Sequence, residues 1–158
     1  MREIAWRHRW AVELLAPQAG ERVLEIGAGH GIATGLLIDA GASVVAVDRS
    51  ARMVEASRKR NPSADIREGE FEAMELGDFD AVVAINVDFA LHDDKGWATR
   101  LHAVLKPGGR AVLVLEAPGP RPAERFALLA ATRLVGAGFR VETIGEAGRV
   151  AVRARRIP

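Results

Sequence analysis

The residues whose types and spacing could do chemistry lie first in the stretch LEIGAGHGIATG, residues 24–35. Three glycines alternate there, at Gly27, Gly29 and Gly31, and Glu25 stands two residues before the first of them. Glycine lets the backbone take positive φ and come close to a ligand. The stretch therefore indicates a nucleotide site.

Further polar residues follow apolar runs, at positions where strands are expected to end. Asp48 closes the run ASVVAVD, Glu70 follows ADIRE, and Asn86 closes FDAVVAIN. The carboxyl ends of parallel strands meet at one edge of a sheet, where α/β proteins bind ligands. The two carboxylate oxygens of Asp48 are enough to accept two hydrogen bonds from a ligand. The alternative is that Asp48 only caps a helix that begins near Ser50.

The spacing of the glycines distinguishes between classes of nucleotide. A dinucleotide fingerprint needs glycine at the first, third and sixth positions of its loop, and here those positions hold Gly27, Gly29 and Ile32. A phosphate-binding P-loop would end in Gly-Lys-Ser/Thr, and this loop does not. The loop therefore predicts a ligand without a pyrophosphate and disfavours a nicotinamide oxidoreductase.

A sheet with helices on both faces is the arrangement that would bring these residues together. Apolar runs predict strands over 22–26, 42–48, 64–68, 79–86, 110–116, 139–144 and 149–157. Periodicity predicts helices over 3–16, 31–40, 51–60, 94–105 and 123–136. We interpret KPGG (106–109) as a turn and APGPRP (117–122) as a loop, because proline interrupts helices and central strands. The short GEAG link predicts an antiparallel pair for the last two strands.

Four motifs resemble those of the class I S-adenosylmethionine-dependent methyltransferases, in the family's order. They are VLEIGAGHG (23–31), VVAVDRSARM (44–53), REGEFEAMEL (67–76) and LKPGGRAVLV (105–114). The motifs span about residues 22–115. The resemblance implies an α/β, three-layer Rossmann-like sandwich with a seven-stranded, mostly parallel sheet whose last strand is antiparallel.

The resemblance also implies S-adenosylmethionine as the cofactor, with S-adenosylhomocysteine as product. It places Glu25 near the cofactor's amino group, Asp48 at the ribose and Glu70 at the exocyclic amine of adenine. The implied cofactor-binding set is Glu25, Gly27, Ala28, Gly29, Gly31, Asp48, Arg49, Met53, Glu70, Phe71 and Asn86. The backbone N–H of Phe71 would meet a ring nitrogen, and Met53 would lie on the adenine face. Alternatives remain: Glu25 in a buried ion pair, Glu68 or Glu72 in place of Glu70, and Met53 as a core residue.

The acceptor side is less specific. Methyl transfer from a sulfonium depends mainly on positioning, and a base is needed only if the acceptor must lose a proton. The resemblance places substrate-facing residues after the fourth strand, where Asn86, Asp88 and His92 are the catalytic candidates and His92 is the candidate base. An Asn-Pro-Pro-aromatic signature is absent, which disfavours a nucleobase acceptor. No spacing of His, Asp and Glu indicates a metal site.

Size and charge limit the remaining possibilities. The chain has 158 residues, no cysteine and a net charge of +1. We expect a single domain over 1–158, whose N-terminal helix within 1–20 either forms a lid with Trp6 and Trp10 or packs them on the sheet. There is no strong nucleic-acid signal and no apolar run of the ~20 residues that cross a bilayer. We expect a cytoplasmic monomer or homodimer that methylates a small molecule. The alternative is a non-catalytic cofactor-binding regulatory or partner subunit.

Overall fold

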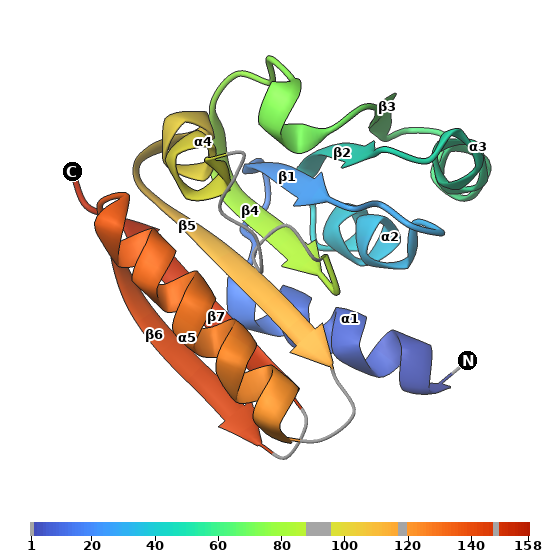
Figure 1. The fold of residues 1–158 in the computed structure, drawn as a ribbon. Helices are drawn as coiled ribbons and strands as arrows, with labels where there is room; N and C mark the ends of the chain where they lie inside the picture. Colours follow the sequence, from blue (N-terminus) through green and yellow to red (C-terminus); the bar gives the residue numbers. More distant parts are fainter. Residues whose placement is uncertain (1, 88–95, 117–119, 147–148) are drawn as a thin grey trace.

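Helices cover both faces of one seven-stranded sheet (Figure 1). The computed structural model describes residues 2–87, 96–116, 120–146 and 149–158. In chain order the elements are α1 (Arg2–Leu15), β1 (Arg22–Ile26), α2 (Ile32–Asp39), β2 (Ser43–Asp48), α3 (Ala51–Arg60), β3 (Asp65–Glu68), the short 3-10 helix η1 (Phe71–Ala73), β4 (Phe79–Ile85), α4 (Trp97–Val104), β5 (Leu105–Glu116), α5 (Pro120–Gly136), β6 (Phe139–Glu146) and β7 (Arg149–Arg156). Among these helices none is both long enough and apolar enough to cross a membrane.

The strands lie in the order β3-β2-β1-β4-β5-β7-β6. β3, β2, β1, β4 and β5 pair in parallel, and β7 is antiparallel to both of its neighbours, β5 and β6. This confirms the predicted fold class, including the antiparallel last strand. The arrowheads of β1, β4 and β5 point to the same side of the molecule in Figure 1. We call this side the carboxyl edge.

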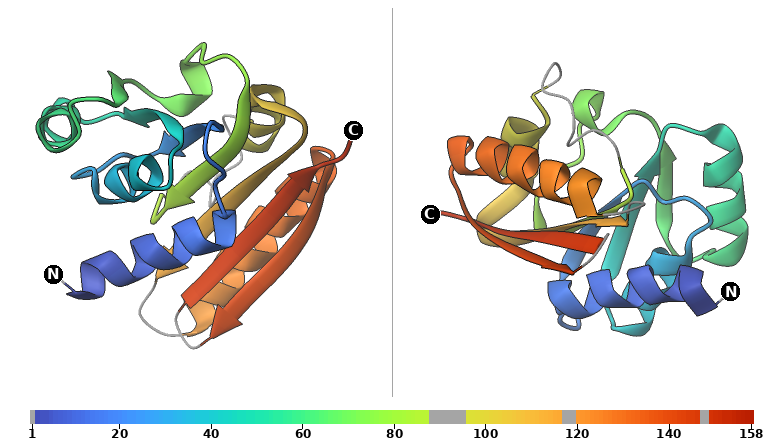
Figure 2. Two further views of the ribbon diagram at one scale, coloured as in Figure 1. Left: turned by 180° about the vertical axis from the view of Figure 1, so that it is seen from behind. Right: turned by 60° about the horizontal axis from the view of Figure 1, so that its bottom comes forward.

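Two apolar clusters hold the layers together, because alternate residues of each strand point to opposite faces of the sheet. One cluster joins the strands to α4 and α5 through side chains such as Trp97 and Phe126. The other joins them to α1, α2 and α3 through side chains such as Leu15 and Leu37. Figure 2 shows α5 and α1 on opposite sides of the strands. The central strands are therefore buried on both faces, as their continuous apolar runs predict.

Two segments differ from the sequence-based prediction. The loop predicted over 117–122 is wrong for its last three residues, because α5 begins at Pro120 and has two prolines in its first turn. That turn has no helical acceptors for its N–H groups, so proline costs little there. The turn predicted over 106–109 lies within β5, whose pairing with β4 shifts register between Phe79 and Ala81. The extra residues form an irregularity in the strand rather than end it.

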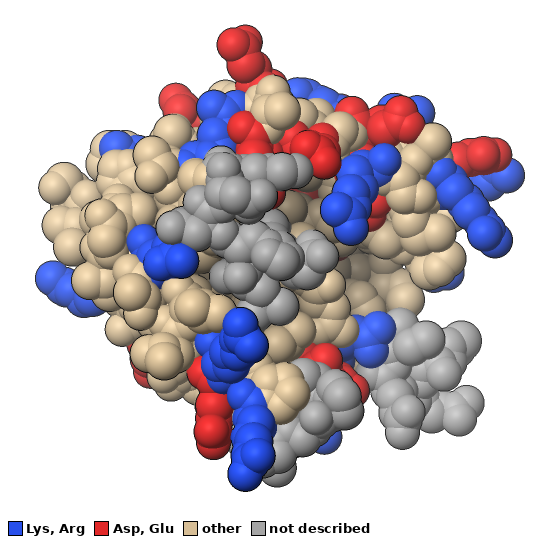
Figure 3. Space-filling model, in the orientation of Figure 1, with Lys and Arg blue, Asp and Glu red and all other residues tan. Residues whose placement is uncertain are grey.

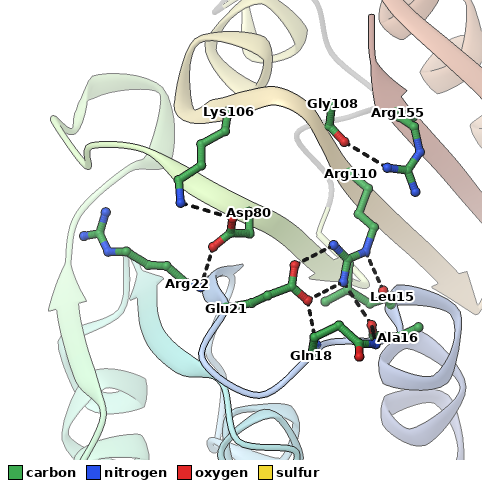
Figure 4. A network of polar contacts seen from close by, with 10 residues as sticks. All are labelled: Leu15, Ala16, Gln18, Glu21, Arg22, Asp80, Lys106, Gly108, Arg110 and Arg155. Carbon is green, nitrogen blue, oxygen red and sulfur yellow. Dashed lines mark hydrogen bonds and ion pairs between the residues drawn. The ribbon is translucent and has the colours of Figure 1, made fainter. Parts of the chain in front are cut away.

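The C-terminal end of α1 is fixed to the sheet by Arg110 of β5 (Figure 4). Its guanidinium donates to the carbonyls of Leu15 at 2.7 Å and Ala16 at 3.0 Å, which the helix leaves without partners. It also donates to both carboxylate oxygens of Glu21, at 2.8 and 2.9 Å. Arg110 pairs with Ala81 near the start of β4, so this contact is toward the end of the sheet opposite the carboxyl edge. The N-terminal end of α1 reaches toward the carboxyl edge (Figure 1).

The edge strand β3 is short and carries its own polar partners. Arg58 of α3 donates to the Ile66 carbonyl at 3.0 and 2.7 Å. Within the strand, Arg67 pairs with Asp65 at 2.7 Å. The contacts of Arg58 fasten α3 to the edge of the sheet.

Candidate functional site

The glycine turn connects β1 to α2 and is fastened to the end of β2. Gly27, Gly29 and Gly31 have φ of 81°, 53° and 84°, the left-handed region that favours glycine. The backbone N–H groups of Gly27 and Ala28 both donate to the Val47 carbonyl, at 2.8 and 3.0 Å. The alternating glycines therefore let the chain leave one buried strand and fold back over its neighbour.

The three glycines have different surroundings. A Cβ on Gly27 would lie 2.7 Å from Cγ2 of Val87, and one on Gly31 would lie 2.5 Å from Nδ2 of Asn61. A Cβ on Gly29 would have no atom within 4 Å. Packing thus requires glycine at Gly27 and Gly31, whereas Gly29 faces open space. This is the geometry that a backbone cradle for a ligand needs.

Asp48 joins the glycine turn to the start of α3. Its Oδ2 accepts from the Gly29 N–H and its Oδ1 from the Ser50 N–H, both at 2.9 Å. Ser50 itself caps α3, because its Oγ accepts from the Met53 N–H at 3.3 Å. The aspartate is therefore not the helix cap. Each of its half-buried carboxylate oxygens has a further lone pair with which to accept from a ligand.

Glu25 lies within the sheet, behind the turn. Its side chain is 3% exposed and accepts from the Thr34 hydroxyl on α2. Burial raises the pKa of Glu25 to about 8, and the negative charge of Asp48 acts in the same direction. The partner is a hydroxyl and not a cation, so the buried-ion-pair alternative is wrong. Near neutral pH the carboxyl group is held mainly in its protonated form, which can donate as well as accept.

The acidic loop after β3 lies beside the ribose-binding candidate. The Gly69 N–H donates to the Asp48 carbonyl at 3.0 Å, which brings the next residue, exposed Glu70, close to the end of β2. Phe71 begins η1, and its side chain is buried in the apolar cluster that contains α4 and α5. Its side chain therefore belongs to the core, and the predicted cofactor contact involves only its backbone N–H. At the start of α3, Met53 is half-buried and Arg49 is exposed.

A pocket of about 480 Å³ lies between α3 and β3. It is lined by Ala51, Val54, Glu55, Arg58, Lys59 and Glu68. None of these residues belongs to the glycine turn. The pocket adjoins the adenine side of the predicted site and does not include its central residues.

Asn86 links the ends of β4 and β5 at the carboxyl edge. It has φ of 53°, a left-handed conformation that asparagine tolerates better than most residues. Its backbone N–H donates to the Val114 carbonyl, and its Oδ1 accepts from the Glu116 N–H, both at 2.8 Å. The other two catalytic candidates, Asp88 and His92, lie outside the described residues.

The two N-terminal tryptophans have different environments. Their ring centroids are 5.7 Å apart and the rings are stacked. Trp10 packs against the apolar cluster under α1, whereas Trp6 belongs to neither cluster and lies 3.9 Å from the guanidinium carbon of Arg149. Arg149 begins β7 and is the register partner of Glu116. Trp10 is thus tied to the core, and Trp6 faces a charged group near the carboxyl edge.

Some contacts around the candidate site have little sequence signal. The amide of Asn61 is 7% exposed and donates to the Gly31 carbonyl at 2.8 Å, so the end of α3 supports the glycine turn. Sequence reasoning treats Asn61 before Pro62 only as a helix stop. Thr34 offered one signal, as a polar residue within the apolar helix that follows the turn. The contact of Trp6 with Arg149 joins the two ends of the chain, and no local pattern predicts it.

Charge is distributed without a dominant sign on the face seen in Figure 3, where basic and acidic side chains are interspersed around the rim. Among the described residues, no three His, Asp or Glu side chains gather in an arrangement that would hold a metal ion. The geometry at the carboxyl edge is thus a backbone cradle, a half-buried carboxylate and a protonated buried acid. That set suits an organic ligand with hydroxyl and amino groups.

Comparisons with known proteins agree with this geometry. Residues 24–113 match the family model described as "Methyltransferase domain". The chain is similar to a demethylmenaquinone methyltransferase of Renibacterium salmoninarum (34% identical; 68% of this chain, 46% of the relative). It is also similar to a protein-L-isoaspartate O-methyltransferase of Methylorubrum extorquens (35% identical; 68% of this chain, 47% of the relative). The chain thus spans about half the length of these curated relatives.

Among solved structures, the fold is similar to that of the N-methyltransferase NodS from Bradyrhizobium japonicum in complex with S-adenosyl-L-homocysteine. The TM-score is 0.79 at 20% identity, over 96% of this chain and 86% of the other. At this identity, the likeness supports the fold.

Proposed function

Because this chain belongs to the class I S-adenosylmethionine-dependent methyltransferase family, we propose that it binds S-adenosylmethionine and transfers the methyl group to a small-molecule acceptor. The observation that carries the proposal is the open space at Gly29, next to the carboxylate of Asp48. The relatives are named for demethylmenaquinone and for protein L-isoaspartate, so their names do not select one acceptor.

We assign the cofactor contacts as follows. The Gly27–Gly31 turn, with Ala28, receives the methionine part of the cofactor, and Glu25 lies behind it toward the amino group. The free lone pairs of Asp48 accept from the two ribose hydroxyls. The adenine lies between Met53 and the loop after β3, where Glu70 and the Phe71 N–H meet its polar edge. Arg49 and Asn86 border the site at the ends of β2 and β4.

The chain's own residues contribute mainly position. The bound cofactor supplies an activated methyl group, so alignment of the acceptor accounts for much of the rate. Asn86 holds the ends of β4 and β5 together and thereby sets the spacing on the acceptor side. Asp88 and His92 follow it in the sequence and remain our candidates for contact with the acceptor. A general base is required only for an acceptor that must lose a proton as it attacks.

The test of cofactor binding uses two glycines with similar backbones. Gly29 and Gly20 both have positive φ and open space around a Cβ, but Gly20 precedes β1, at the opposite edge of the sheet. Alanine should therefore impose comparable backbone strain at either position. In calorimetric titrations with S-adenosylhomocysteine, we expect Gly29→Ala to lose at least about tenfold in affinity, or about 1.4 kcal/mol. Gly20→Ala should bind like the wild type. Equal affinity in both variants would remove Gly29 from the site.

Cofactor identity and catalysis need separate measurements. At about a hundredfold excess over its dissociation constant, S-adenosylhomocysteine should raise the unfolding free energy by about 2.7 kcal/mol, and NADH at the same concentration should not. Stabilisation by NADH alone would overturn the cofactor assignment. Incubation with S-adenosylmethionine and a library of small molecules should yield a product heavier by one CH₂. Cofactor binding without any such product would favour the alternative of a non-catalytic binding subunit.

A further inference from the structure

We propose that Arg149, held against Trp6, is the acceptor-recognition group of this protein and selects small molecules that carry a carboxylate beside a flat apolar body. The inference rests on the proposed methyl transfer and goes beyond it, because it names the chemical class of the acceptor. It rests on Trp6 and Arg149, which lie far apart in the sequence and are not part of the proposed cofactor site.

The sheet topology places Arg149 at the carboxyl edge. β7 runs antiparallel to β5, so the first residue of β7 lies beside Glu116, the last residue of β5. The Glu116 N–H donates to the Asn86 side chain at 2.8 Å. A continuous line of neighbours therefore runs from Asn86, where the acceptor is expected, to Arg149 and on to Trp6.

The cation–π geometry leaves Arg149 able to bind an anion. Its guanidinium carbon lies 3.9 Å from the centre of the Trp6 ring, so the indole face holds the group through its π-electrons. A guanidinium held in this way keeps N–H donors in its own plane for a bidentate contact with a carboxylate. The Arg149 side chain is exposed, and its guanidinium forms no hydrogen bond or ion pair with any side chain that the structure describes, Glu116 included.

Stacked and packed side chains support this pair. Trp6 is stacked on Trp10, and Trp10 packs against the apolar cluster beneath α1. The far end of α1 is fixed by the contacts of Arg110 with the Leu15 and Ala16 carbonyls. These contacts position the Arg149 guanidinium before any ligand arrives. The entropic cost of ordering this side chain when a carboxylate binds is therefore smaller. The apolar edges of the indoles provide contact area for a flat ligand body.

The competing explanation is that the pair merely holds α1 against β7. Arg153 provides a matched control, because it lies four residues further along β7, on the same face, and its charge is paired with Glu142 at 2.6 Å. A purely structural contact at Arg149 would affect stability and leave ligand selection unchanged. An acceptor contact would affect selection between charged and neutral ligands.

The experiment uses the whole chain, saturated with S-adenosylhomocysteine, and follows the indole N–H resonances of its three tryptophans by NMR. Benzoate, 4-hydroxybenzoate and indole-3-acetate are each titrated alongside the corresponding methyl ester. We expect at least one acid to shift the Trp6 resonance and to bind about tenfold or more tightly than its ester. The signal of Trp97, which is 1% exposed in α4, serves as the internal reference. Arg149→Gln should abolish the preference for the acid, Arg149→Lys should restore part of it, and Arg153→Gln should retain it.

Three results would overturn the inference. The first is that no acid shifts the Trp6 indole resonance more than its ester does. The second is an unchanged preference for the acid in Arg149→Gln, and the third is an equal loss of that preference in Arg153→Gln. A lower melting temperature in Arg149→Gln with the acid preference intact would show that the pair only holds α1. Failure of the wild type to bind S-adenosylhomocysteine would instead refute the proposed function, and it is detected before any acid is added.

Discussion

At the scale of single residues, the structure gives Asp48 one role, and we propose a second. One oxygen holds the Gly29 N–H and the other holds the Ser50 N–H, so the side chain orders the turn and the start of α3 together. Its remaining lone pairs are available to a ligand. A substitution at this position should therefore affect both stability and ligand affinity, whereas a substitution of the true cap should affect stability alone.

Asp48→Ala should weaken S-adenosylhomocysteine binding by roughly 10- to 150-fold, because two ribose hydroxyls lose a charged acceptor. It should also lower the unfolding free energy by about 1–3 kcal/mol, because two backbone N–H groups lose theirs. Ser50→Ala, which removes the cap of α3, should cost about 1 kcal/mol and leave affinity unchanged. Calorimetry and urea unfolding of both variants measure the two effects. An equal loss of affinity in the two variants would assign the effect of Asp48 to the helix start alone.

At the scale of elements, α1 is held at its two ends by different chemistry. Arg110 binds its C-terminal carbonyls and pairs with Glu21, and the pKa of Glu21 is lowered, chiefly by its hydrogen bonds with Arg110. Near the N-terminal end, the contacts are aromatic stacking and the guanidinium of Arg149. The helix therefore depends on two arginines from strands far away in the sequence.

Arg110→Met should lower the unfolding free energy by about 2–3 kcal/mol, because charged hydrogen bonds to the helix end and to Glu21 disappear together. Tryptophan fluorescence should report the loosening of α1, since Trp6 and Trp10 lie on that helix. Lys106→Met is the comparison, since its pair with Asp80 is 49% and 28% exposed and should contribute at most about 1 kcal/mol. Similar losses in both variants would show that Arg110 does not anchor α1.

At the scale of the whole molecule, the buried acid of Glu25 makes stability depend on pH. Its pKa is raised from 4.5 to about 8 in the folded protein. Between those values the folded state binds more protons than the unfolded state, so the unfolding free energy falls as pH rises. The stabilisation contributed by Glu25 is fully present below the pKa of the unfolded state. It is completely lost only above the pKa of the folded state.

Glu25→Gln should therefore flatten the decline in stability between about pH 4.5 and about pH 8, where this group contributes at most about 1.4 kcal/mol per pH unit. Glutamine keeps an acceptor for the Thr34 hydroxyl and cannot ionise, so the variant should be the more stable protein at the alkaline end. Urea unfolding across this range measures the slope. A decline as steep in the variant as in the wild type would show that another group causes it.

Sequence patterns predicted most of the architecture, because the relevant physics is local. Continuous apolar runs identified the buried strands, and the positive-φ requirement identified the turn at Gly27–Gly31. The same local reasoning failed where the position of a residue within its helix or strand determines the structure. The prolines of APGPRP predict a loop, yet Pro120 occupies the first turn of α5, where no acceptor is missed. KPGG predicts a turn, yet β5 continues through it.

The supporting residues of the site were beyond sequence reasoning because they depend on distant contacts. Arg110 reaches Leu15 across 95 positions, and Asn61 reaches Gly31 across 30. An arginine in a strand or an asparagine before a proline is common, and only the folded chain shows what each one binds. Strand-end residues such as Asp48 could be predicted because the sheet collects them at one edge, whereas Arg149 was missed because it begins its strand.

The contact between Arg58 and the Ile66 carbonyl also affects whether β3 can pair with a strand of a second molecule. β3 ends the sheet, and an uncovered strand at such a border can pair with a strand of a second molecule and extend into a shared ribbon. Arg58 occupies one of its carbonyl acceptors with two hydrogen bonds from within the same chain. The four-residue length of β3 and its Asp65–Arg67 charges leave little backbone for a visiting strand to follow. The side chain that fastens α3 thus also makes this edge of the sheet a poor template for a strand of a second molecule.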